Sequence, residues 1–347
     1  ESEPGTLKDG YLMDYDPHLM IEGTIISADA VRADLAFIYI RGEFGWLIDR
    51  VQKAVDEAYA AGYLGKDILG TGYDLDMIVH KGAGAYICGE ETGLINSVTG
   101  TKGQPSIKPP FPAVAGFLGK PTIVNNVETV AAVPWIMVNG ADAYRQIGTE
   151  KSTGTKLWSV SGPVKNQGVF EIPLGMPFAE FYRDHLGGMR DGEEFKACIV
   201  GGSSVPVLTA EEMMNCNLDY ESLQEAGTML GSGGMIVIPK SADMVELIKV
   251  LMHFYWDESC GQCTPCREGT GWLHRLVGKL LKGEGVPEDL ELFDKVCEGM
   301  GGLTICPLAD AAVMPMQSFL QRFRDEFAAR IHEAARSGST SRWARGE

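Results

Sequence analysis

The sequence predicts three folded parts: an α/β domain over residues 1–153, an α+β domain of the β-grasp type over 154–240, and a C-terminal α-helical bundle over 241–336. Strand-like and helical runs alternate in the first part, short strand-like runs between glycine turns fill the second, and helical periodicity dominates the third. With 347 residues and 45% hydrophobic content, the chain is long enough for two or three domains. The Gly-, Ser- and Arg-rich residues 337–347 lack periodicity and predict a disordered tail.

The first domain is predicted from a strand, a helix, a second strand and a glycine loop in succession. Residues 34–40 are rich in β-branched and aromatic side chains and predict a strand. Residues 46–61 have apolar side chains at a helical period, and the apolar run 75–79 predicts the next strand. This order is typical of an α/β layered domain.

The glycine loop after the second strand has two interpretations. Gly82 and Gly84 satisfy the first two positions of a dinucleotide fingerprint, but Ile87 occupies the third. Glu90 and Glu91 suit the positive end of a helix, yet beside a phosphate they would be repulsive. A glycine-lined pocket with carboxylates therefore fits a ribose or a ring N–H better than a pyrophosphate. From the residues alone, a helix start and a nucleotide site both stay open.

Two polar segments follow the glutamates. Lys108 to Phe111 encloses two prolines and predicts a stiff extended segment that presents a cation and an aromatic face, or simply a connector. Asn125, Asn126 and Thr129 precede an apolar helix, as an N-cap or as polar contacts to a ligand. Such groups interleaved with glycine favour a planar cofactor with polar edges.

The second domain is predicted from short strand-like runs at 156–160, 169–172, 196–200 and 235–238, with one helix near 178–185. In the third part, the predicted helical stretches are 244–256, 272–281, 287–297 and 309–335.

The third part also contains the motif with the most specific chemistry. Cys260, Cys263 and Cys266 are spaced by two residues and can turn three sulfurs toward one point, as an iron-sulfur cluster requires. Cys306 is the expected fourth ligand because the glycines before it can bring backbone N–H groups close to cluster sulfides. Cys297 lies four residues after Phe293 on an apolar helix face and is expected to be core.

Structural zinc is the alternative for this motif, but zinc sites usually show two separated Cys-x-x-Cys pairs. A disulfide framework is disfavoured because eight cysteines in 347 residues are sparse and a signal peptide is not expected.

The net charge of −17 disfavours nucleic acid and anionic membrane surfaces as partners, since both require basic patches. No apolar run reaches the roughly 18 residues that cross a bilayer, so direct membrane insertion is not expected.

Six motifs occur in one order along the chain. They are Glu-Ser-Glu-Pro-Gly-Thr from Glu1, Gly-Ala-Tyr-Ile-Cys-Gly-Glu-Glu-Thr from Gly84, Lys-Pro-Pro-Phe-Pro from Lys108, Val-Asn-Asn-Val-Glu-Thr from Val124, the cysteine triplet from Glu258, and Thr-Ile-Cys from Thr304. Together they closely resemble the NADH-binding flavoprotein subunit of bacterial NADH-quinone oxidoreductase, respiratory complex I. The match runs from residue 1 to about residue 335.

The resemblance implies an FMN- and NADH-binding domain, a β-grasp domain of the soluble-ligand-binding type, and a bundle holding one 4Fe-4S cluster. It implies that FMN is lined by Glu1, Gly89, Glu90, Asn125, Asn126 and Thr129. It implies that NADH is faced by Glu3, Glu91, Lys108 and Phe111, and that the cluster is held by Cys260, Cys263, Cys266 and Cys306.

Two departures from the family accompany the match. The family has, upstream of Glu1, a strand ending in Asn-Ala-Asp and a glycine-rich loop that cradles FMN, so the sequence is expected to be N-terminally truncated. Pro307 follows the last ligand where relatives carry varied apolar residues, and only a modest local effect is expected.

By the same resemblance, the protein oxidises NADH by hydride transfer to FMN and passes electrons singly to the cluster, without a covalent or general acid-base residue. Expected partners are a thioredoxin-like 2Fe-2S subunit and a large multi-cluster iron-sulfur subunit, in a complex at the cytoplasmic face of the cell membrane. The alternatives are a diaphorase subunit of an NAD-reducing hydrogenase or NAD-dependent formate dehydrogenase, and a non-enzymatic zinc and β-grasp scaffold.

Overall fold

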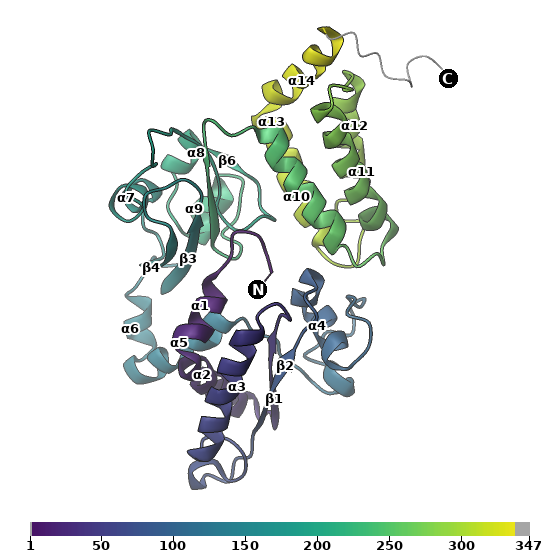
Figure 1. The fold of residues 1–347 in the computed structure, drawn as a ribbon. Coiled ribbons are helices and arrows are strands. Elements are labelled where there is room, and N and C mark those ends of the chain that lie inside the picture. The colour runs from purple at the N-terminus through teal and green to yellow at the C-terminus, as the bar shows by residue number, and fades with distance from the viewer. Residues whose placement is uncertain (1, 337–347) are drawn as a thin grey trace. The chain divides into compact units, whose positions relative to one another are not determined.

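A computed structural model describes residues 2–336, and these residues form two compact units. The first unit consists mainly of residues 6–159 with 169–175, and the second mainly of residues 160–168 with 176–336. Each unit mixes helices and strands (Figure 1), which confirms a mixed α/β fold. The predicted tail over 337–347 lies outside the described residues.

The first unit contains a parallel strand pair connected through a helix. The elements are β1 (Leu35–Ile40), α3 (Gly45–Ala60) and β2 (Asp76–Lys81). The two strands pair in parallel over their whole length, as a right-twisted pair joined by a helical crossover does. In α3, Leu47, Val51 and Val55 are completely buried at a helical period. This arrangement confirms the two strands and the helix that the sequence predicts here.

Three helices that the sequence did not predict, or predicted only in outline, complete this core. They are α1 (Lys8–Tyr15), α2 (Pro17–Val31) and α5 (Val127–Asn139). The side chain of Asp16 caps α2 by accepting a hydrogen bond from the backbone N–H of Leu19 at 3.0 Å. Helices α2 and α5 pack closely at Gly23, where an added Cβ would lie 1.8 Å from the carbonyl oxygen of Val130. Only glycine permits this approach.

The rest of the first unit consists of shorter helices and turns. They are a turn at Ile68–Gly70, a turn at Tyr86–Gly89, α4 (Glu91–Val98), a turn at Phe117–Gly119 and α6 (Ala141–Arg145). The backbone bends at Lys108 and turns just after Phe111, so the predicted extended segment is wrong. A chain that bends there can place the Lys108 side chain against α4, as described below.

A five-stranded sheet with the order β4-β3-β7-β5-β6 follows. Its strands are β3 (Thr155–Ser161), β4 (Gly168–Pro173), β5 (Phe195–Ile199), β6 (Leu208–Thr209) and β7 (Gly234–Pro239), and the helices among them are α7 (Phe178–Asp184), α8 (Ala210–Met214) and α9 (Tyr220–Glu225). The four predicted strands and the predicted helix are all present, and β6 is an additional short strand. β5 pairs in an antiparallel sense with both β6 and β7. The boundary between the compact units falls within β3, after Ser159.

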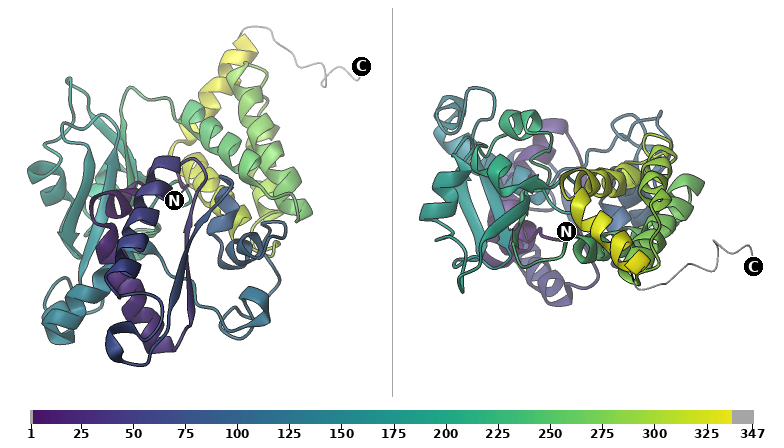
Figure 2. Two further views of the ribbon diagram at one scale, coloured as in Figure 1. Left: turned by 60° about the horizontal axis from the view of Figure 1, so that its bottom comes forward. Right: turned by 90° about the horizontal axis from the view of Figure 1, so that it is seen from above.

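The C-terminal part of the second unit is helical (Figure 2). Its helices are α10 (Met244–Glu258), α11 (Thr264–Leu281), α12 (Glu288–Glu298), α13 (Leu308–Arg322) and α14 (Arg324–Arg336). The predicted single stretch over 309–335 is two helices, because the helical backbone is interrupted at Phe323. Cys297 is buried on α12, which confirms its assignment to the core.

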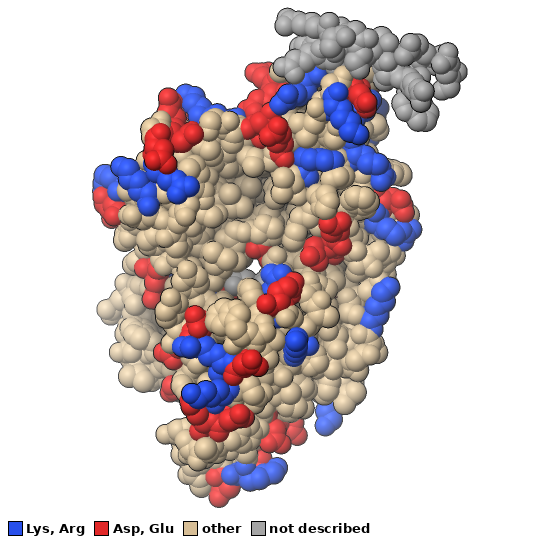
Figure 3. Space-filling view, viewed as in Figure 1, with Lys and Arg blue, Asp and Glu red and all other residues tan. Residues whose placement is uncertain are grey.

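Acidic and basic side chains are interspersed over the face shown in Figure 3, in a chain whose net charge is −17. Within residues 2–336, no helix combines the length and the apolar character needed to cross a bilayer.

Candidate functional site

The start of α4 carries the first group of predicted site residues. Glu90 is the N-cap of this helix, and its Oε2 accepts hydrogen bonds from the backbone N–H groups of Thr92 at 2.9 Å and Gly93 at 3.0 Å. The helix-start interpretation of the two glutamates is therefore confirmed, and the carboxylate of Glu90 is held in a fixed position.

Lys108 joins the two glutamates. Its Nζ lies 3.2 Å from Glu90 Oε1 and also donates a hydrogen bond to Glu91 Oε1. Burial alone would raise the pKa of Glu90, but hydrogen bonds from Thr92, Gly93 and Lys108 outweigh it and keep that pKa below its ordinary value. The pKa of Lys108 is raised, mainly by its hydrogen bond to Glu91. The three side chains thus form one hydrogen-bonded group.

Gly89, the residue before Glu90, borders open space. A Cβ added at Gly89 would meet no atom within 4 Å, and the ring of Phe111 is 57% exposed. Gly82 and Gly84 do not share this property, because added Cβ atoms there would approach the side chains of Tyr39 and Glu43 to within 3 Å. The two glycines of the partial fingerprint therefore serve close packing, and the open position is Gly89.

The start of α5 carries the second group. Asn125, Asn126 and Thr129 are all exposed. Asn126 is the N-cap of α5, and its Oδ1 accepts a hydrogen bond from the backbone N–H of Glu128 at 3.0 Å. Its exposed amide is compatible with a flavin contact, since one N–H of Nδ2 has no acceptor among residues 2–336. Glu1 lies outside the described residues.

Glu3 belongs to the second compact unit. Its Oε1 accepts hydrogen bonds from the backbone N–H of Ser204 at 3.0 Å and from the hydroxyl of the same residue. Burial raises the pKa of Glu3 despite these bonds and one from Ser232. The residue that the resemblance assigns to NADH is therefore engaged by serines of its own unit.

The four predicted cluster ligands lie in two segments of the helical part. Cys260 and Cys263 precede α11, Cys266 lies in its first turn, and Cys306 stands just before α13. The pKa of Cys266 is raised to about 11, mainly by burial; a hydrogen bond with Ser259 opposes the increase, and the nearby Cys306, Cys260 and Cys263 add to it. Cys306, Cys260 and Cys263 therefore lie close enough to Cys266 to affect its pKa.

The surroundings of Cys306 differ from expectation in one respect. The backbone N–H of Gly302, one of the glycines expected to face the cluster, donates to Asp310 Oδ1 at 2.8 Å. Pro307 is the N-cap residue of α13. In the described part of the chain, no three His, Cys, Asp or Glu side chains are grouped closely enough to hold one metal ion; a 4Fe-4S cluster takes its four thiolates at four separate irons.

The sequence analysis did not predict a group of buried charged side chains that lies next to Asn126. Lys8, Asp9 and Lys156 are each at most 7% exposed, and Glu128 contacts both lysines. Buried charges carry no sequence signal, because charged residues in a helix normally indicate a solvated face.

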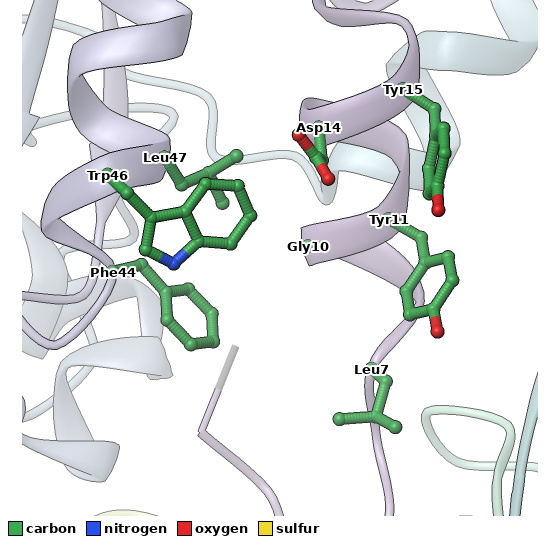
Figure 4. A pocket seen from close by; sticks show the side chains of 8 residues that line it. All are labelled: Leu7, Gly10, Tyr11, Asp14, Tyr15, Phe44, Trp46 and Leu47. Carbon is green, nitrogen blue, oxygen red and sulfur yellow. The ribbon is translucent and has the colours of Figure 1, made fainter.

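The first unit also has an aromatic cavity of about 290 Å³ between α1 and the start of α3 (Figure 4). Trp46 and Phe44 face the cavity from one side and Tyr11 faces it from the other. Asp14 contributes a carboxylate to the lining. The sequence pattern indicates Trp46 only as the first residue of a predicted helix and does not predict this cavity.

Comparison with known proteins places these sites in a family context. Residues 1–135 match the family model described as the Nuo51 FMN-binding domain. Residues 246–330 match the model described as the NADH-ubiquinone oxidoreductase-F iron-sulfur binding region. The two matched ranges contain the α4 and α5 groups and the four cysteines, respectively.

Relatives that match nearly the whole chain indicate the same family. The chain is 46% identical over 333 residues to the second F-type chain of NADH-quinone oxidoreductase in Rhizobium meliloti, with 96% of this chain and 79% of the relative covered. It is 48% identical over 331 residues to the F-type chain of NADH-quinone oxidoreductase in Mycobacterium bovis, covering 95% and 74%. Among solved structures, an NAD⁺-reducing [NiFe]-hydrogenase in the H₂-reduced state matches with a TM-score of 0.86 and 33% identity. That match covers 94% of this chain and 55% of the hydrogenase chain.

Proposed function

The chain belongs to the family of F subunits of NADH-quinone oxidoreductase, and on this premise we propose which of its residues carry the reaction. It oxidises NADH by hydride transfer to FMN and passes the electrons singly to a 4Fe-4S cluster, as the electron-input component of NADH-quinone oxidoreductase. The observation that best supports the residue assignment is that Cys306, Cys260 and Cys263 all lie near enough to Cys266 to raise its pKa.

We assign the residues as the motifs indicate. FMN is contacted by Glu1, Gly89, Glu90, Asn125, Asn126 and Thr129; NADH by Glu3, Glu91, Lys108 and Phe111; the cluster by Cys260, Cys263, Cys266 and Cys306. Bound FMN supplies a hydride acceptor and the cluster a one-electron acceptor.

The protein's own side chains orient the nucleotide. Glu91 can accept hydrogen bonds from ribose hydroxyl groups, and the exposed ring of Phe111 offers a flat apolar face. Lys108 offsets one of the two negative charges of Glu90 and Glu91, so that a dinucleotide with two phosphates meets one net negative charge there instead of two. Glu90, fixed as a helix cap, has acceptor oxygens for the polar edge of the flavin. No residue of this group has to take or give a proton.

A change at Cys306 tests the proposal. Anaerobically purified protein should contain about four iron atoms and four acid-labile sulfides per chain, and Cys306→Ser should lose most of both because one thiolate ligand is missing. Cys297→Ser is the matched control, since Cys297 is a buried core cysteine, and should keep its iron. Stoichiometric zinc without sulfide, or iron loss in the control with normal iron in Cys306→Ser, would contradict the assignment.

The chain is one component of a larger complex, and we propose its neighbours. A thioredoxin-like 2Fe-2S subunit and a large multi-cluster iron-sulfur subunit would take the electrons onward, at the cytoplasmic face of the cell membrane. We also keep the three-part division at 153/154 and 240/241 as a proposal, supported by the change from mixed elements to helices alone after β7.

The hydrogenase match supports a second candidate assembly, the diaphorase module of an NAD-reducing enzyme. Native purification of the protein distinguishes the two. We expect it to co-purify with 2Fe-2S and multi-cluster subunits and with membrane-arm subunits of a quinone reductase. Co-purification with a nickel or molybdenum subunit would establish the alternative, and a monomer that reduces its physiological acceptor unaided would contradict both.

A further inference from the structure

We propose that Lys8 and Asp9 are positioning residues of the flavin site, which hold the side-chain amide of Asn126 in a single orientation and so direct one of its N–H groups to FMN. The inference rests on the flavin role proposed above for Asn126, and it adds two residues that no motif assigns. All residues concerned lie in the first compact unit.

Every N–H group of the Lys8 ammonium has an acceptor. Its three N–H donors meet three acceptors: Asp9 Oδ1 at 2.6 Å, Asn126 Oδ1 at 2.8 Å and Glu128 Oε2 at 3.0 Å. Lys156 contacts the same carboxylate of Glu128, whose Oε1 also accepts the backbone N–H of Leu157 at 2.8 Å. Two lysines and two carboxylates balance in charge, as buried ions must.

The amide of Asn126 has only one orientation that satisfies these neighbours. Its Oδ1 accepts from Lys8 Nζ and from the backbone N–H of Glu128, while its Nδ2 donates to Asp9 Oδ2 at 3.0 Å. A flipped amide would place NH₂ against an ammonium and a backbone N–H, and a carbonyl oxygen against a carboxylate. Hydrogen-bond networks of this kind decide amide orientation.

Solvent exposure distinguishes Lys8 and Asp9, which position the amide, from Asn126, which binds the ligand. Lys8 is 3% and Asp9 7% exposed, so neither charge can reach a ligand directly, whereas Asn126 is exposed. The second N–H of Asn126 Nδ2 has no acceptor within residues 2–336. It is a fixed donor at the surface, suited to an acceptor atom of the ligand.

FMN offers such acceptors at its ring carbonyl groups and at its phosphate. A donor held in advance binds without losing rotational freedom, which improves affinity. Loss of one such hydrogen bond weakens binding by about three- to tenfold.

A double-mutant cycle in full-length, flavin-depleted protein tests the inference, with FMN affinity read from the quenching of flavin fluorescence. Asn126→Ala removes the donor, and Asp9→Asn leaves one acceptor oxygen in place of the two that accept from Lys8 and from Asn126. Each single change should weaken FMN binding by about three- to tenfold, and the double variant should bind no more weakly than Asn126→Ala alone, because Asp9 acts through Asn126. Titration with riboflavin alongside FMN shows whether the ring or the phosphate takes the bond.

Asp289→Asn is the matched control. Asp289 is also a buried carboxylate that accepts from a lysine, Lys279 at 2.7 Å, but it lies in the second unit, and its loss should leave FMN affinity unchanged. If Asp9→Asn does not fold by circular dichroism, Lys8→Arg takes its place, since a planar guanidinium cannot repeat the three contacts of an ammonium.

The outcomes are separable. Equal weakening by Asp9→Asn with and without the Asn126 side chain would overturn the positioning role while leaving Asn126 as a flavin contact. Unchanged FMN affinity in Asn126→Ala would instead remove the role proposed for Asn126, and the inference with it.

Discussion

Replacing Glu91 by Gln is expected to narrow the preference for NADH over NADPH in kcat/KM by about ten- to a hundredfold. A carboxylate near the adenosine ribose accepts hydrogen bonds from the 2′-hydroxyl and repels the 2′-phosphate of NADPH, and like charges brought together cost several kcal/mol. The side chain of Glu91 is 38% exposed, so solvent reduces the effect. The substitution also frees Lys108 from one partner, which favours a phosphate further.

Steady-state kinetics on full-length protein with its flavin bound measure this ratio. Glu57→Gln is a suitable control, since Glu57 is an exposed carboxylate on α3 that pairs with His18, and the ratio should not change there. If Glu91→Gln weakens both nucleotides alike at normal flavin occupancy, Glu91 only opens a helix, and Glu3 is the next residue to test.

Replacing Lys8 by Met is expected to lower the free energy of unfolding by about 3–5 kcal/mol, the usual cost of leaving a buried charge without its partner. Desolvation lowers the pKa of Lys8, but the charges of Asp9 and Glu128 outweigh it and raise the pKa above its ordinary value. A raised folded-state pKa stabilises fully below the unfolded value of 10.5 and loses the effect only as pH rises through the folded value. Urea unfolding at pH 7 therefore measures the whole contribution.

Lys66→Met provides the same chemical change at an exposed ion pair with Asp74 and should alter stability little. In the double variant Lys8→Met with Asp9→Asn, the carboxylate left without a lysine is replaced by a neutral amide, while Glu128 keeps Lys156, so part of the lost stability should return. A Lys8→Met protein as stable as Lys66→Met would show that the buried ammonium contributes nothing net.

The strands and most helices could be predicted because each carries its own local pattern. The run 34–40 concentrates β-branched and aromatic residues, and α3 repeats buried Leu47, Val51 and Val55 at a helical period. Helix α1 has no such pattern, since its buried residues include Lys8 and Asp9. The break at Phe323 between α13 and α14 carries no proline or glycine signal either.

The candidate site, too, could be predicted only where its residues follow a local sequence pattern. Cysteine spacing and the Asn-Asn motif identify residues whose chemistry is local. The bridge from Lys108 to Glu90 and Glu91 joins residues 17 and 18 positions apart, and Lys8 lies 118 positions from Asn126. Such partners meet only through tertiary structure, which a linear pattern does not encode.

The contact between Gly23 and the carbonyl of Val130 has a consequence for inherited variation. A methyl group at position 23 would displace the first turn of α5, which begins next to Asn126. A substitution at this position of α2, remote in sequence from every motif, would then weaken FMN binding through Asn126, and a higher FMN concentration should restore part of the lost activity. For the interpretation of variants, α2 counts as part of the cofactor site.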